Sequence, residues 1–342
     1  MKMHRYSIAA LGAALLLAGC SNPAPAADSS TASASSADSA GTANGVKIGI
    51  LQYTEHPALD AATKGFEDYL KENGYADAKI DFNSAQNEVA NCTSIAQKYV
   101  NDDVALIYAV ATPAAQAAAN ETKDIPIIVS AVTDPADSGL VASNDAPGGN
   151  VTGASDLNPI EAQFDLLQEI LPEAKTVGLL YCNAESNSVF QINLAKEQCE
   201  ARGLEYQEAS VTDSNQIQQV VESLNGKVDV IYVPTDNLMA ESMATVTQIA
   251  NSFGIPTIVG EEGMVANGAL ATYGIDYYKL GQLAGAQAVS ILKGESEPKD
   301  MAIEYLATDE CTLTYNPETA EKLNLNLPES VIDRGVVIGE EE

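Results

Sequence analysis

The chain has 342 residues, with 48 acidic against 17 basic side chains and a formal net charge of −31. So acidic a protein is not expected to bind nucleic acid, because displacing counterions from phosphates needs clustered Lys and Arg. Apolar residues make up 46% and charged residues 19% of the chain, which is typical of a globular protein, and at about 150 residues per domain the length favours two domains.

The first twenty residues have the pattern of a lipoprotein export signal. A basic head precedes the apolar run 8–19, which as a helix is about 18 Å long, too short for a hydrocarbon core of about 30 Å. The run ends in Leu17-Ala18-Gly19-Cys20, which resembles the bacterial lipobox. We expect 1–20 to be a signal peptide with a lipid on Cys20, at the outer face of the bacterial cell membrane. The alternative is an ordinary secretion signal.

A predicted tether follows the signal, and the rest of the chain has few side chains that could bind a metal. Residues 21–45 contain only Ser, Ala, Pro, Asp, Thr, Asn and Gly, so they cannot bury apolar area and are expected to form a flexible tether. His56 is the one histidine after the signal, and the later cysteines include no C-x-x-C pair. We therefore expect neither a metal nor a cofactor.

From residue 46 onward, short apolar runs alternate with helical patterns. This alternation predicts an α/β protein built from βαβ units with parallel sheets. The expected strands are 46–52, 79–82, 104–110, 126–130, 175–181, 204–209, 228–233 and 256–259. The expected helices are 58–73, 88–101, 113–122, 160–171, 187–202, 214–224, 237–253 and 276–293.

The alternation occurs twice, in two similar series. Corresponding strands follow each other at offsets of 124 to 130 residues, with Ile48, Ile107 and Ile127 matching Val177, Ile231 and Thr257. The series therefore predicts two Rossmann-like lobes in one chain. Polar and small residues follow the strands of both lobes, and ligands of open parallel sheets bind at those carboxyl ends. We expect a binding cleft between the lobes.

The motifs of this body also resemble a known family. The lipobox, IGILQYTEHPALD, ATPAAQA, TDPADSGLV, NVTGASD, PTDN and ALATYGIDYYKLGQLAG are similar to the solute-binding lipoproteins of ABC importers. The similar subgroup is the one linked to tryptophan, tyrosine and related aromatic amino acids. The resemblance covers 46–335 and implies a periplasmic-binding-protein fold of type I with three hinge crossings, working with a permease and its ATPase.

The resemblance implies the following domain boundaries. The first lobe would comprise 46–156 plus 276–306, the second 157–275 plus 307–335, and 336–342 would be an acidic tail. Hinge torsion is expected at Gly153, Ser155 and Asp156, since hinges are a few residues at the ends of elements.

First-lobe residues are candidates for binding a ligand carboxylate. Thr112, Pro113 and Ala114 open a helix, where free N–H groups and the helix dipole favour an anion. The hydroxyls of Ser130 and Thr133, with Asp134, follow the next strand. The alternatives are a plain helix cap for Thr112 and a turn for Asp134.

Second-lobe residues are candidates for the ammonium of a zwitterion. Asp236 is the first choice, with Asn237 beside it, and its alternative role is to cap the helix 237–253. Glu261 and Glu262 are the next candidates. Asn187 and Ser188 begin another second-lobe helix and could contact an anionic group.

Aromatic and polar residues near strand ends complete the predicted site. Tyr53, Tyr181 and Tyr273 could stack on an aromatic ligand, although core packing is the alternative. The full set of predicted ligand contacts is Gln52, Tyr53, Thr112, Ala114, Ser130, Thr133, Asp134, Asp156, Asn187, Ser188, Asp236, Asn237, Glu261 and Tyr273. His56 is interpreted as structural or as part of the rim.

Together these patterns predict a binding protein and not an enzyme. We expect a monomeric, lipid-anchored, extracytoplasmic protein that captures a small zwitterion, an aromatic amino acid such as tryptophan or tyrosine, for an ABC permease. A sensor of the same fold is one alternative. A secreted α/β enzyme is the other, but His56 has no partner evident in the sequence to form a nucleophile–base pair.

Overall fold

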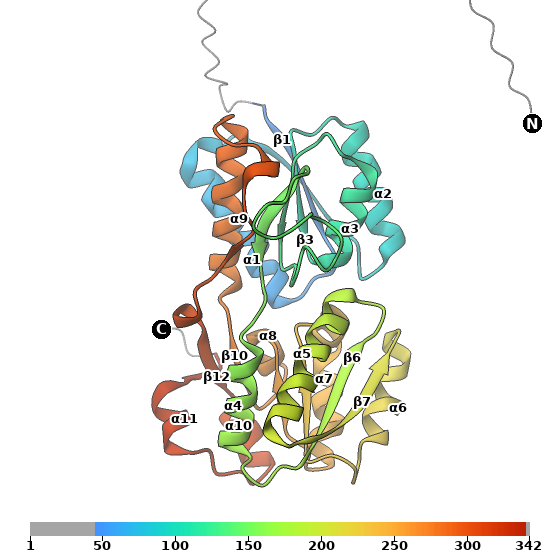
Figure 1. The fold of residues 1–342 in the computed structure, drawn as a ribbon, viewed down its shortest axis with the longest axis vertical. Helices are drawn as coiled ribbons and strands as arrows, with labels where there is room; N and C mark the ends of the chain where they lie inside the picture. Colours follow the sequence, from blue (N-terminus) through green and yellow to red (C-terminus); the bar gives the residue numbers. More distant parts are fainter. Residues whose placement is uncertain (1–44, 340–342) are drawn as a thin grey trace, which may run out of the picture. The chain divides into compact units, whose positions relative to one another are not determined.

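The computed structural model describes residues 45–339, which form two α/β lobes (Figure 1). The predicted signal peptide, the lipid site Cys20 and the tether up to residue 44 lie outside the described residues, as do residues 340–342. Within 45–339, no helix is long and apolar enough to cross a membrane.

The first lobe is built on a six-stranded sheet in the order β11-β5-β4-β3-β1-β2, in which all strands are parallel. Its strands are β1 (Lys47–Gln52), β2 (Lys79–Ser84), β3 (Leu106–Val110), β4 (Ile127–Ser130), β5 (Val151–Ser155) and β11 (Glu304–Tyr305). Its helices are α1 (Pro57–Leu70), which continues as a π-helical turn over Lys71–Tyr75, α2 (Val89–Asn101), α3 (Thr112–Glu121) and α9 (Tyr277–Leu292), with a 3-10 turn over Pro298–Asp300.

The second lobe has a seven-stranded sheet in the order β13-β12-β10-β9-β8-β6-β7. Its strands are β6 (Thr176–Cys182), β7 (Glu205–Val211), β8 (Val230–Val233), β9 (Thr257–Val259), β10 (Ala271–Gly274), β12 (Thr312–Tyr315) and β13 (Val336–Val337). Its helices are α4 (Ile160–Ile170), α5 (Ser186–Arg202), α6 (Ile217–Ser223), α7 (Asn237–Ser252), α8 (Glu262–Ala266), α10 (Pro317–Lys322) and α11 (Glu329–Arg334). Short 3-10 turns lie at Ser214–Gln216 and Thr308–Glu310.

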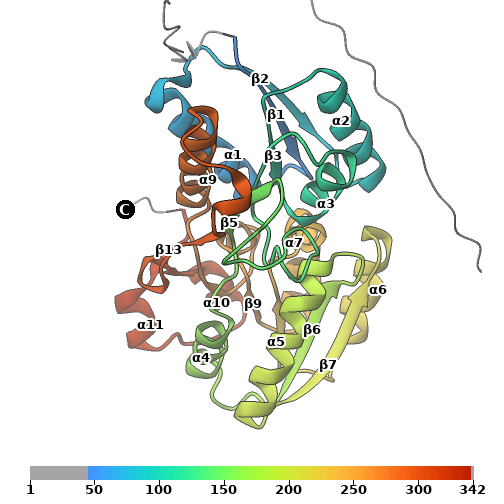
Figure 2. The same ribbon diagram turned by 45° about the horizontal axis from the view of Figure 1, so that its top comes forward.

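Helices α1 and α9 pack closely in the first lobe, although more than 200 residues separate their starts (Figure 2). Glycine permits the approach: a Cβ on Gly281 would lie 1.9 Å from the Ala62 carbonyl oxygen, and one on Gly65 would lie 2.0 Å from that of Tyr278. Beneath them the rings of Phe66 and Tyr108 stack with centroids 3.8 Å apart. The apolar stripe of α1 thus packs on the core of the first lobe.

The predicted alternation of strands and helices is confirmed, with two corrections. The second sheet is mixed and not purely parallel, because β12 runs antiparallel to β10. The chain beyond residue 335 is not only a tail, because Val336 and Val337 pair with β12 as strand β13. The number of hinge crossings stays a prediction.

Strand β5 lies in a segment that was predicted only as a crossing between the lobes, and not as a strand. Its residues, VTGAS, lack the large apolar side chains of the other strands, yet all five are buried. Gly153 has φ of +145°, and a Cβ there would lie 2.0 Å from the Val129 carbonyl oxygen. Close approach of β4 therefore requires glycine at this position.

Candidate ligand-binding site

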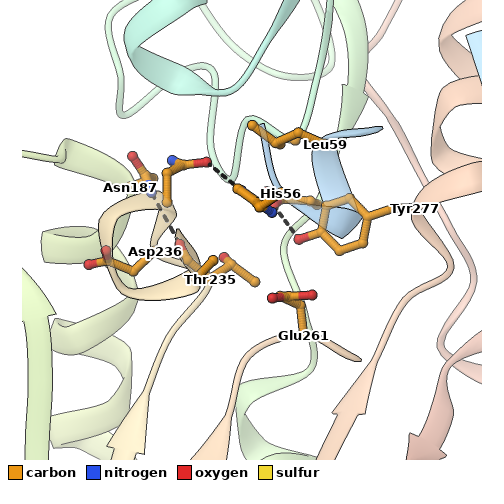
Figure 3. A pocket seen from close by; sticks show the side chains of 11 residues that line it. His56, Leu59, Asn187, Thr235, Asp236, Glu261 and Tyr277 are labelled. Carbon is orange, nitrogen blue, oxygen red and sulfur yellow. Dashed lines mark hydrogen bonds between the residues drawn. The ribbon is translucent and has the colours of Figure 1, made fainter. Parts of the chain in front are cut away.

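A narrow cavity lies where the two lobes meet (Figure 3). The space between its side chains is about 270 Å³, part of it open to solvent, and it leaves room for about one water molecule. The first lobe and its connections contribute His56, Leu59, Ala131, Asp156 and Tyr277 to its wall, and the second lobe contributes Asn187, Thr235, Asp236, Asn237, Ala240 and Glu261.

The wall is acidic. Asp156, Asp236 and Glu261 are each at most 4% exposed. Among the described residues, no Lys or Arg lines the cavity, and none of the ion pairs includes these three carboxylates. Burial raises the pKa of all three carboxyl groups, that of Glu261 to about 7. The cavity therefore favours a positively charged group.

Asp236 is the N-cap of α7 and is held from two directions. Its Oδ1 accepts a hydrogen bond from the Met239 N–H at 2.9 Å, and its Oδ2 accepts one from the Cys182 N–H at 2.6 Å. The capping role that the sequence left as the alternative is thus present. Its two oxygens already have backbone partners.

Glu185 is a buried carboxylate that sequence reasoning missed. It accepts hydrogen bonds from the Asn237 Nδ2 at 2.5 Å and the Leu238 N–H at 3.0 Å, so a second carboxylate sits at the N-terminus of α7. Burial, reinforced by the charge of Asp236, raises the pKa of Glu185 to about 8. In a chain this acidic, nothing in the local sequence distinguishes Glu185 from a solvated glutamate.

Asp156 connects the end of β5 to α9. Its Oδ1 accepts from the Thr133 hydroxyl at 3.0 Å and its Oδ2 accepts from the Tyr277 hydroxyl at 2.8 Å. Burial, followed by the charge of Asp156, raises the pKa of Tyr277 well above its usual range, so the phenol stays protonated and donates.

Three acceptor or donor atoms of the cavity wall have no hydrogen-bond partner among residues 45–339. They are His56 Nδ1, Asn187 Oδ1 and Glu261 Oε1. The other Glu261 oxygen accepts from the Gly263 N–H at 2.5 Å, at the start of α8. Figure 3 places Glu261 across from His56 and Tyr277, with Asn187, Thr235 and Asp236 at the other side of the cavity.

Five of the predicted contacts line the cavity: Asp156, Asn187, Asp236, Asn237 and Glu261. Sequence reasoning missed Leu59, Ala131, Thr235, Ala240 and Tyr277, and it placed His56 only in a structural role or at the rim, whereas His56 also lines the cavity. Thr235 and Tyr277 are next to predicted residues, so the PTDN and IDYY motifs could have indicated them. His56 precedes Pro57 at the start of α1, and its side chain makes no capping hydrogen bond there.

Several other predicted contacts are buried but do not line the cavity. Gln52 is buried and bonded to Asp60 and Thr63, Ser130 is bonded to Tyr108, and Thr133 to Asp156. Ser188, Thr112 and Ala114 are buried at the starts of α5 and α3. Of these, Thr112 keeps its hydroxyl without a partner in the described part of the chain.

The remaining predicted contacts lie further away. Tyr53 lines a separate and larger groove of about 820 Å³, and its hydroxyl donates to the Asn87 carbonyl. Asp134 accepts from the N–H groups of Ala136 and Asp137, which is the turn that the sequence left open. Tyr273 lies on β10, half-buried. Because strand ends carry both cavity residues and their supports, sequence position could not separate the two groups.

The described residues hold no group of three or more His, Cys, Asp or Glu side chains that could bind a metal ion. Cys92, Cys182, Cys199 and Cys311 are free, and burial raises the pKa of each thiol. Thiolate chemistry is therefore not favoured at any of these positions.

Residues 47–336 match the model of the family described as ABC transporter substrate binding protein. The chain belongs to this family. This substrate-binding protein is 46% identical over 281 residues to a protein from Clostridioides difficile named tyrosine-binding protein, a match that covers 81% of each chain. Proteins of this family bind a small molecule outside the cytoplasm and work with an ABC permease; they are binding proteins and not enzymes.

Two solved structures are similar to the substrate-binding protein described here. An ABC domain from Streptococcus pneumonia in complex with L-Trp is 36% identical, with a TM-score of 0.83 covering 86% of this chain and 99% of that one. The ligand-free, open structure of a substrate-binding protein with adhesive properties from Clostridium difficile is 43% identical, with a TM-score of 0.66 and the same coverages. Both likenesses confirm the two-lobe fold of periplasmic-binding-protein type I.

Proposed function

We propose that this substrate-binding protein captures an aromatic amino acid, tyrosine or tryptophan, between its lobes and delivers it to an ABC permease with its ATPase. One observation carries the proposal: both lobes enclose a cavity whose wall holds three buried carboxylates and, among the described residues, no Lys or Arg. An ammonium group offsets that buried negative charge. The names of the relatives, tyrosine-binding and in complex with L-Trp, agree with an aromatic ligand.

The arrangement of the lobes supports capture by closure. The chain matches the L-Trp complex with a TM-score of 0.83 at 36% identity, but the open, ligand-free protein with only 0.66 at 43% identity. The lower TM-score to the open protein, despite its higher identity, supports a closed arrangement of the lobes in this chain. The narrow cavity then requires the lobes to separate for entry, and the ligand favours closure through contacts to both.

The amino-acid carboxylate needs donors, which the first lobe can supply. The N-terminus of α3, a helix of ten residues, presents N–H groups, and the buried Thr112 hydroxyl has no partner in the part of the chain that the structure describes. Ala111 and Ala131, next to these elements, both have positive φ, 82° and 53°. Strained backbone of this kind clusters at ligand sites. We infer that the carboxylate end of the ligand faces this lobe.

Titration calorimetry on the full chain tests the proposal. Tyrosine, tryptophan and phenylalanine are titrated, with leucine and N-acetyltyrosine as controls. A micromolar Kd for tyrosine or tryptophan, about −8.2 kcal/mol, is expected, with at least tenfold weaker binding of both controls. No binding of any aromatic amino acid would contradict the proposal. Recovery of chemically altered ligand would instead favour an enzyme.

Transport and sensing are separated by a second experiment. In proteoliposomes holding an ABC permease with its ATPase, uptake of labelled tyrosine should depend on this protein and on ATP. Binding without uptake would favour a sensor.

We propose further that Cys20 carries a lipid and that the protein is a monomer. The lipobox-like Leu17-Ala18-Gly19-Cys20 supports the first statement. Replacing Cys20→Ser should release the protein from the membrane fraction, and light scattering of the released protein should give the monomer mass. Membrane retention of this variant, or a dimer mass, would contradict them.

A further inference from the structure

Two unpartnered atoms face the cavity from opposite lobes. His56, at the start of α1, is 7% exposed, and Glu261, at the start of α8, is 3% exposed. Both line the cavity, and neither His56 Nδ1 nor Glu261 Oε1 has a hydrogen-bond partner within residues 45–339. A buried polar atom without a partner costs about 1–3 kcal/mol, so each atom calls for a ligand partner.

The orientation of Asn237 determines which proton His56 carries. The Asn237 Nδ2 group donates to the Glu185 carboxylate at 2.5 Å, so its Oδ1 is turned toward His56 Nε2, 3.4 Å away. An amide oxygen can only accept, so Nε2 holds the imidazole proton and Nδ1 is a bare acceptor. Burial lowers the pKa of His56, which keeps the ring neutral.

Glu261 supplies the charge that a neutral imidazole lacks. One of its oxygens is engaged by the Gly263 N–H, and the other is free. The oxygens of Asp236 and Asp156 each have a donor already, from backbone N–H groups and from the hydroxyls of Thr133 and Tyr277. Glu261 therefore offers the least satisfied carboxylate oxygen of the wall.

We propose that His56 Nδ1 and Glu261 Oε1 together bind a primary ammonium group of the ligand, which donates one N–H to each of these two acceptors. The inference rests on the proposed function and assigns the ammonium to this pair in place of Asp236. Because the two acceptors belong to different lobes, the ammonium joins the lobes as it binds, whereas Asp236 and Asp156 shape the wall and add negative potential. N-acylation removes both the charge and two of the donors.

The first test measures the affinity of variants of the full chain for tyrosine or tryptophan. Glu261→Gln should weaken binding about 10- to 150-fold, the range for a hydrogen bond to a charged group. Glu197→Gln is the control, since Glu197 is exposed on α5 outside the cavity and should change affinity less than twofold. Equal effects of the two variants would overturn the assignment.

Paired substitutions at His56 separate its two nitrogens. Asparagine carries its amide at the position of Nδ1, and glutamine carries it near Nε2. His56→Asn should keep affinity within about fivefold of the wild type, whereas His56→Gln should lose at least tenfold. The reverse order would show that Nε2, and not Nδ1, contacts the ligand.

The second test reads the tautomer directly and needs no ligand. Nitrogen NMR on protein labelled at its two histidines should show His56 with a protonated Nε2 and a bare Nδ1, the His56 signals being those lost in His56→Gln. A proton on Nδ1 would overturn the inference even if no aromatic amino acid binds. Adding tyramine, a primary ammonium without a carboxylate, should shift Nδ1; saturation without a shift would also overturn it.

Discussion

Glu241 of α7 accepts a hydrogen bond from the Asn87 side-chain amide at 3.0 Å, and the two residues belong to different lobes. The Thr54 hydroxyl donates to the same Glu241 oxygen at 3.4 Å. Asn87 is held in a left-handed conformation, φ of 62°, by a backbone hydrogen bond to Tyr53 at 2.9 Å. None of these residues lines the cavity, so the contact joins the lobes without contacting a ligand there.

Replacing Glu241→Ala should therefore weaken ligand binding indirectly. Loss of net hydrogen bonds of about 0.5–1.5 kcal/mol from the closed form predicts a two- to tenfold higher Kd, with most of the change in the dissociation rate. Stopped-flow fluorescence measures the rates. The ratio of tyrosine to tryptophan affinities should not change. A variant of Glu200, exposed on α5, serves as the control, and an effect as large there would contradict the closure role.

Asp236 should act chiefly on stability. Because its oxygens accept from Met239 and Cys182, Asp236→Ala leaves backbone N–H groups unpaired and should lower the free energy of unfolding by about 0.5–2 kcal/mol. Asn is a comparable cap but has only one acceptor oxygen, so Asp236→Asn should keep the Met239 contact, lose the Cys182 contact and be less destabilised than Asp236→Ala. Urea unfolding measures both. If alanine and asparagine were equally destabilising, charge and not capping would be the role of Asp236.

Gly281 should not tolerate a larger side chain. Its Cβ would lie 1.9 Å from the Ala62 carbonyl oxygen, so Gly281→Ala forces α9 away from α1 and should cost about 1–3 kcal/mol. Thermal unfolding should show the loss, while Gln282→Ala on the same helix should have a small effect. Wild-type stability in Gly281→Ala would contradict the close helix contact.

The buried carboxylates should make stability fall as pH rises. The folded pKa values of Glu185 and Glu261, about 8 and about 7, lie above the ordinary value near 4.3. Between the ordinary pKa and the raised values, the folded protein therefore binds more protons than the unfolded chain. The stability present at low pH is lost as pH rises through 7 and 8. Buried neutral His56, with its lowered pKa, opposes this below pH 6.5.

Urea unfolding from pH 5 to pH 8.5 measures this dependence. Glu185→Gln removes one titrating group, so its free energy of unfolding should fall less with pH than that of the wild type. An identical slope would mean that Glu185 titrates normally in the folded protein.

Local sequence patterns predicted most of the strands and helices. The strand Val230–Val233 and the helix Asn237–Ser252, for example, lie within two residues of their expected limits, because buried strands and amphipathic helices have different periods. Strand β5 was missed because VTGAS has no such pattern, and its pairing with β4 depends on Gly153.

The site was predicted in part. Asp156, Asn187, Asp236, Asn237 and Glu261 line the cavity because they follow strands or begin helices at the edge where sheets bind ligands. Gln52, Ser130 and Thr133 occupy similar sequence positions but point into supporting hydrogen bonds. The direction of a side chain at a strand end depends on neighbours that are distant in sequence.

The sequence by itself determined the repeated α/β pattern, the polar strand ends and the acidity of the chain. These features depend only on composition and on the local spacing of apolar residues. Only the tertiary structure decided which polar atoms are satisfied. His56 meets Asn237 across 181 residues of chain, and Asn237 is turned by Glu185. Hydrogen-bond satisfaction is a property of atoms brought together in space, so the acceptors left for a ligand emerge only when both lobes are in place.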